Sequence, residues 1–161
     1  MGRTLFIMKK MQGYNLVETC KQLISATEKA GIYVSFFEDV YNSVPKDSVE
    51  GIIEEDPLSE SDGQFDPVGK RQYMFNISEC NIYNGSWHNP DYFKAIDFSL
   101  TSAAERHDDF FFKFATSYFE ENPNDYLWYG SASLDCIYSA DDIMKLKNAP
   151  YDKTWMYNKT I

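Results

Sequence analysis

Apolar residues recur at helical spacing in three stretches of the chain, residues 15–30, 102–121 and 139–150. In the first stretch Asn15 stands at the cap position, where its side chain can accept a hydrogen bond from a free backbone amide. Gly31 suits a left-handed end of the helix. The second and third stretches each begin with a serine that is followed three residues later by an acid, the arrangement of a capping box. The pattern therefore predicts about three helices.

Strands are predicted where β-branched and aromatic residues cluster or alternate with polar ones. These segments are residues 4–8, 32–37, 69–83, 92–100, 126–129 and 134–138. In the second of them Phe36 and Phe37 are adjacent, so a strand would place their rings on opposite faces. Because the segments come in neighbouring pairs, we expect an α+β fold. It would have an antiparallel or mixed sheet of about five strands, with about three helices packed on it.

Negative charge is concentrated in residues 38–66, EDVYNSVPKDSVEGIIEEDPLSESDGQFD. Ten acidic residues and one lysine stand there, in a chain whose net charge is −10. Prolines and glycines in the segment argue against long regular elements, and residues 47–55 favour a short helix. Apolar residues such as Val49, Ile52 and Ile53 indicate that the segment packs partly on the body of the protein. We therefore expect a single domain over residues 1–161, with an acidic loop or insertion at about 38–66.

The composition favours a well-packed protein and narrows the choice of partner. A chain of 161 residues with 17% aromatic residues has the size and the ring content of one folded domain. Phosphate binding needs clustered lysines and arginines, so neither nucleic acid nor an anionic membrane is expected as a partner. No signal peptide and no membrane-spanning run is found in the sequence, and we expect a cytoplasmic protein.

No catalytic motif is found in the sequence. The three cysteines are far apart and form no Cys-x-x-Cys pair, which favours reduced, partly buried thiols. His88 and His107 lack the spacing of a zinc site, and neither a nucleophile elbow nor a phosphate-binding loop occurs. We therefore expect a non-enzymatic binding protein with no cofactor and no metal. Its acidic segment favours a protein partner with a basic surface, because opposite charge raises the rate of encounter.

Two C-terminal segments resemble a known group of proteins. They are DDFFFKFATSYFEENPNDYLW, residues 108–128, and IYSADDIMKL, residues 137–146. Both are similar in style to the C-terminal halves of bacterial immunity proteins from contact-dependent inhibition and polymorphic toxin systems. The resemblance implies an intracellular inhibitor that covers the active site of one cognate toxin. It carries over no binding residues, because these families vary widely.

Charge alone nominates the partner-binding residues, and a loop tryptophan is added as a possible aromatic anchor. They are Glu50, Glu54, Glu55, Asp56, Glu60, Asp62 and Trp87. A basic nuclease toxin is an attractive partner, because carboxylates imitate the phosphates that its groove binds. Three alternatives remain open. In the first, the acidic segment is only a solvated loop. In the second, the chain is a small-ligand-binding domain or an enzyme with an aromatic pocket. In the third, it is a phage or mobile-element accessory protein.

Overall fold

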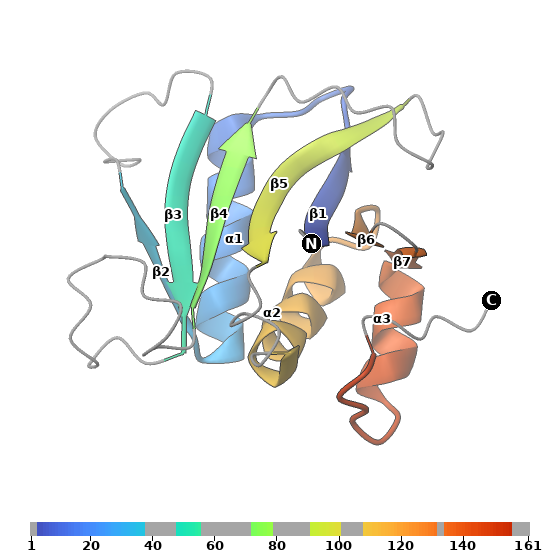
Figure 1. Cartoon of the computed structure of the whole chain (residues 1–161). Helices are drawn as coiled ribbons and strands as arrows, with labels where there is room; N and C mark the ends of the chain where they lie inside the picture. Colours follow the sequence, from blue (N-terminus) through green and yellow to red (C-terminus); the bar gives the residue numbers. More distant parts are fainter. Residues whose placement is uncertain are drawn as a thin grey trace.

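The computed structural model describes residues 3–37, 48–55, 72–78, 91–100, 108–131 and 134–155. These residues form an α+β fold (Figure 1). In chain order the elements are β1 (Arg3–Lys10), α1 (Leu16–Ala30), β2 (Tyr33–Phe36), β3 (Ser48–Glu54), β4 (Gln72–Ser78), β5 (Tyr92–Leu100), α2 (Asp108–Glu121), β6 (Tyr126–Ser131), β7 (Leu134–Ser139) and α3 (Ala140–Lys147). Within these ranges, no helix combines the length and the apolar character needed to cross a membrane.

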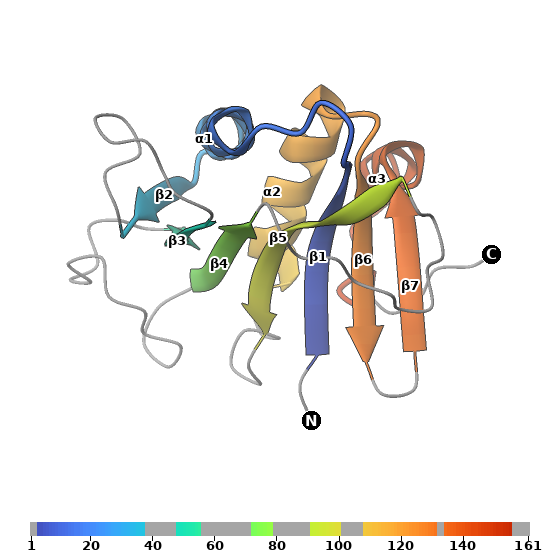
Figure 2. The same ribbon diagram turned by 90° about the horizontal axis from the view of Figure 1, so that it is seen from above.

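The described strands join one antiparallel sheet in the order β2-β3-β4-β5-β1-β6-β7. The first strand of the chain lies inside the sheet, between β5 and β6, so distant parts of the sequence are paired directly. Figure 2 shows α1, α2 and α3 on the same side of the sheet. Among the described residues, the sheet therefore has a helix-covered face and a helix-free face.

The predicted fold class is confirmed, but the sheet has seven strands, where about five were expected. One reason is that residues 47–55 do not form the predicted helix. They contain β3, which pairs with β2 on one side and with β4 on the other. Val49 and Ile53 alternate toward the core, opposite Ile77 and Tyr73 of β4. Strand pairing on both sides and burial of these side chains outweigh the weak local preference for a helix.

The caps of α1 and α3 follow the sequence prediction. Asn15 Oδ1 accepts a hydrogen bond from the Glu18 backbone amide at 3.0 Å, and Gly31 ends α1 in the left-handed region at φ 72°. In α3 both bonds of the capping box between Ser139 and Asp142 are present. These contacts satisfy backbone groups that a helix terminus otherwise leaves unpaired. The predicted start of the middle helix at residue 102 lies outside the described residues.

The core lies between the sheet and the helices and is rich in aromatic rings. Phe111 of α2 is fully buried, and its ring centroid lies 5.0 Å from Tyr73 on β4 and 5.1 Å from Phe98 on β5. The helix also contacts α1 and α3, which explains the broad apolar arc of its sequence. Burial of each such ring stabilises the fold by roughly 1.5–3 kcal/mol, so the sheet is held firmly under α2.

Candidate functional site

The structure places three of the predicted partner-binding residues in β3 or directly after it. Glu50 is exposed, Glu55 is half-buried, and Glu54 is only 4% exposed. Gln72 of β4 lies opposite Glu54 and donates a hydrogen bond from Nε2 to Glu54 Oε2 at 3.0 Å. Glu54 is therefore buried beside Gln72, where an exposed acid was expected. Outside the described residues lie Asp56, Glu60, Asp62, Trp87, His88 and His107.

Strand pairing assembles a polar row across the helix-free face. Glu50 on β3 lies opposite Asn76 on β4, and Asn76 lies opposite Asp97 on β5. Asn76 Nδ2 donates a hydrogen bond to Glu50 Oε1 at 3.3 Å. Burial raises the pKa of the Asp97 carboxyl above its ordinary value, and the nearby Lys94 ammonium partly offsets this. Two carboxylates from different parts of the sequence thus share one row.

Two exposed aromatic side chains lie on the same face at the β2 edge of the sheet, Phe37 next to Glu50 and Tyr33 opposite Glu54. Tyr33 is 49% exposed and Phe37 is 47% exposed. Phe36 instead packs toward the core, with its ring centroid 5.6 Å from that of Phe75, so Phe36 and Phe37 point to opposite faces as predicted. The Phe37 amide donates to the Glu50 carbonyl oxygen at 2.9 Å, which places Phe37 next to Glu50. We call Tyr33, Phe37 and Glu50 the edge patch.

The charge pattern of the sequence predicted Glu50, but no pattern identified the two aromatic members of the edge patch as exposed. Tyr33 and Phe37 belong to a run of apolar and aromatic residues that predicts a buried strand equally well. Their alternation with Val34 and Phe36 is the signal that separates the two faces. Only the packing of the helices on one side of the sheet shows which of these faces is exposed.

Two lysines on the helix-covered side are paired with one acid of the same chain. Glu120 of α2 lies 3.1 Å from Lys29 Nζ and 2.9 Å from Lys147 Nζ, and so connects all three helices. Hydrogen bonds from Lys147 and Lys29 lower the pKa of Glu120. Glu50, in contrast, receives its side-chain hydrogen bond from the neutral amide of Asn76. Within the described part of the chain, no lysine or arginine neutralises Glu50.

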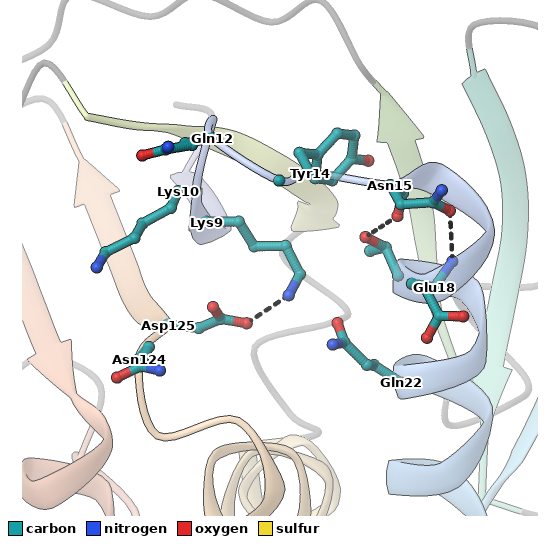
Figure 3. A pocket seen from close by; sticks show the side chains of 11 residues that line it. Lys9, Lys10, Gln12, Tyr14, Asn15, Glu18, Gln22, Asn124 and Asp125 are labelled. Atoms are coloured by element: carbon teal, nitrogen blue, oxygen red, sulfur yellow. Dashed lines mark hydrogen bonds and ion pairs between the residues drawn. The ribbon is translucent and has the colours of Figure 1, made fainter.

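A polar pocket of about 220 Å³ lies where the end of β1 meets α1 and the turn between α2 and β6 (Figure 3). At its base Lys9 Nζ lies 2.7 Å from Asp125 Oδ2, and both residues are 8% exposed. The Tyr118 hydroxyl donates to the same oxygen at 2.7 Å. Burial and the Asp125 carboxylate raise the pKa of Tyr118 well above 10.0, so its hydroxyl remains a donor. Tyr14 is the one aromatic residue in the lining, so the pocket is not the aromatic one considered from the sequence.

The described residues offer no arrangement typical of a metal site or a reactive thiol. Among them, no three residues of the types His, Cys, Asp and Glu are grouped closely enough to hold a metal ion. Cys20 and Cys136 are free and buried, and burial raises the pKa of the Cys20 thiol to about 11. A thiol with such a pKa stays protonated at neutral pH and reacts slowly as a nucleophile. Cys80 lies outside the described residues.

Comparison with protein-family models, with curated proteins and with solved structures gives no match to this chain. The edge patch and the polar pocket are the two candidate sites that the described residues offer.

Proposed function

We propose that the protein binds a basic protein partner through the edge patch, and that it is a non-enzymatic immunity protein that neutralises a bacterial toxin in the cytoplasm. One observation carries the proposal. Tyr33 and Phe37 leave about half of their surface in solvent, at 49% and 47%, and lie on the same face as the exposed Glu50. Aromatic rings next to an acid form a surface suited to a partner with apolar and cationic groups.

The two aromatic side chains supply the apolar part of the proposed contact. This chain buries large rings throughout its core, including five phenylalanines of α2 and β5 that are at most 1% exposed. An exposed aromatic residue gives up solvent contact at little cost in conformational freedom when a partner covers it. Tyr33 and Phe37 are therefore the residues from which we expect most of the binding free energy.

Glu50 supplies the charge of the proposed contact. It lies in the middle of the acidic segment, and its neighbour Asn76 holds the carboxylate by a neutral hydrogen bond. Its negative charge is therefore available to a cationic partner, whereas Glu120 is already paired with two lysines. Uncompensated charge of this kind raises association rates and makes them dependent on salt.

The further acids of the segment extend the same proposal. Glu55 follows β3 directly, and Asp56, Glu60 and Asp62 come next in the sequence. Together with Trp87 they remain predicted partner-binding residues. Glu54 has a supporting role in the proposal, because it is buried beside Gln72 and holds β3 against β4. Such a dense set of carboxylates favours a toxin with a phosphate-binding groove, such as a nuclease.

Co-expression tests the proposal. The probe is the toxin domain encoded by the reading frame next to the gene for this chain, produced in cells that this toxin alone kills. We expect growth to be restored and the two proteins to elute as one complex at physiological salt. Growth arrest in the presence of the folded protein, together with separate elution of the two proteins, would contradict the proposed function.

A further inference from the structure

The polar pocket contains two acceptor atoms that receive no hydrogen bond from the described residues. Gln22 Oε1 is buried and has no hydrogen-bond partner there. Asp125 accepts from Lys9 and from Tyr118, but both bonds go to Oδ2, so Oδ1 accepts from no side chain in the described ranges. Figure 3 shows the Gln22 side chain extending from α1 toward Lys9 and Asp125. A buried acceptor without a donor is unfavourable, and a ligand with N–H groups would satisfy it.

Lys9 offers the opposite capacity in the same space. Its ammonium group has three N–H donors, and Asp125 Oδ2 takes one of them. Lys9 lines the pocket and is held in place by this ion pair. The position of the nitrogen that carries its remaining N–H donors is therefore fixed. A ligand oxygen near Lys9 would accept from them. The pocket thus presents acceptors at Gln22 and Asp125, and a donor at Lys9.

The charges in the lining indicate whether the pocket suits an anion, a cation or a ligand with both charges. Two lysines, Lys9 and Lys10, and two acids, Glu18 and Asp125, line the pocket, so its formal charge is balanced. A simple anion would meet the two carboxylates, and a simple cation would meet the two ammonium groups. A ligand that carries one charge of each sign matches both halves of the lining. Its size is limited, because 220 Å³ is below the range of about 300–1,000 Å³ that accepts drug-sized molecules.

We propose that this pocket binds a small zwitterion with an ammonium group and a carboxylate on the same carbon atom, the backbone group of a free α-amino acid. The ammonium donates to Gln22 Oε1 and to Asp125 Oδ1. The carboxylate accepts from Lys9 Nζ. This binding does not depend on the edge patch, which is formed by β2 and β3, so it stands or falls separately from the proposed toxin partner.

The test is a titration of the ¹⁵N-labelled full chain, followed by ¹H–¹⁵N NMR spectra. L-alanine is the probe, and ethylamine and propionate are matched analogues that lack the carboxylate or the ammonium group. We expect saturable shifts for L-alanine at the Gln22 side-chain amide and in residues 12–15, with affinity on the order of millimolar. Each analogue should bind about tenfold more weakly or worse, because it leaves one half of the pocket unmatched.

Two substitutions of the same kind give the matched control. Gln22→Met removes the buried acceptor with little change in length, and Glu28→Met replaces a polar side chain of the same length at an exposed residue of the same helix outside the lining. We expect the first to weaken L-alanine binding about tenfold and the second to leave it unchanged. Absent or non-saturable shifts in the unmodified protein would overturn the proposal and indicate that water fills the pocket. Equal binding of the three probes, or unchanged binding by folded Gln22→Met, would overturn it as well.

Discussion

Lys9 and Asp125 form an ion pair with 2.7 Å between Nζ and Oδ2, although 116 positions separate them in the sequence. Lys9 continues the inward alternation of Leu5 and Ile7 at the end of β1, and Asp125 stands in the turn that leads from α2 to β6. The Tyr118 hydroxyl donates to the same carboxylate oxygen. The pair therefore holds the first strand of the chain against the turn between α2 and β6 and forms the base of the polar pocket.

Removal of one partner from this pair should destabilise the fold strongly. Asp125→Ala leaves the Lys9 ammonium buried without its carboxylate, and we expect a loss of about 3–5 kcal/mol in the free energy of unfolding. Tyr118→Phe keeps the ion pair and removes one hydrogen bond to a charged group, for an expected loss of about 1–3 kcal/mol. Urea denaturation followed by circular dichroism measures both values.

The double variant Lys9→Met with Asp125→Leu is the control for buried charge. It replaces both charges by apolar side chains, so it should recover more than half of the stability lost in Asp125→Ala. If Asp125→Ala costs under about 1 kcal/mol, the pair is effectively solvated and does not hold β1 in place.

Gly51 is required by the close approach of β3 to its neighbours. A Cβ atom at this position would overlap the Ser35 carbonyl oxygen on β2 and would lie 2.7 Å from the Phe75 ring. Gly51→Ala should therefore cost about 1–3 kcal/mol and displace β2, which carries Tyr33 of the edge patch and leads into Phe37. Chemical denaturation gives the cost, and faster amide hydrogen exchange in residues 33–36 would report the displacement. Ser48→Ala, at an exposed position of the same strand, should stay within about 0.5 kcal/mol of the unmodified protein.

Aromatic and acidic members of the edge patch should affect different rate constants of binding to the cognate toxin. The double variant Tyr33→Ser, Phe37→Ser should raise the dissociation rate about tenfold or more, because it removes the apolar anchors. Glu50→Gln should instead lower the association rate about twofold to fivefold and reduce its dependence on salt. Surface plasmon resonance at several salt concentrations separates the two effects.

Controls for these variants lie on other parts of the surface. Tyr151 is 46% exposed and follows α3, and Glu28 is exposed on α1. Tyr151→Ser and Glu28→Gln should leave both rate constants nearly unchanged. Equal effects from the control variants and the edge-patch variants would place the binding surface elsewhere.

Asp97 should make the stability of the protein depend on pH. Burial raises the pKa of its carboxyl in the folded state, so the folded protein favours the protonated form. This contribution is fully present below the ordinary pKa of 3.8 and is lost as the pH rises through the folded-state pKa. At pH 7 the ionised carboxylate therefore lowers stability, and Asp97→Asn should raise the free energy of unfolding by up to about 1 kcal/mol.

The same variant tests the sign of this effect. The gain from Asp97→Asn should shrink as the pH is lowered and disappear below about pH 4. Urea denaturation at a series of pH values measures the difference between the two proteins. A gain that is constant with pH, or a loss at pH 7, would show that attraction to Lys94 outweighs burial.

Local signals in the sequence were enough for the helices and for most strands. The Asn15 cap, the Gly31 ending and the Ser139 capping box act between residues at most four apart, so they operate in the chain before it folds. The alternation in residues 72–78 likewise defines the two faces of β4. β3 was missed because Ile52 is also buried and obscures the alternation of Val49 and Ile53 with Glu50 and Glu54.

The sequence by itself determined the fold class, the helix caps and the concentration of acids in one segment. Tertiary structure alone decided that Glu54 is buried while Glu50 is exposed, that Tyr33 and Phe37 lie at an edge, and that Lys9 meets Asp125. The physical reason is distance along the chain. A cap or an alternating pattern depends on near neighbours, whereas burial and ion pairing depend on which distant strand or turn comes to lie alongside.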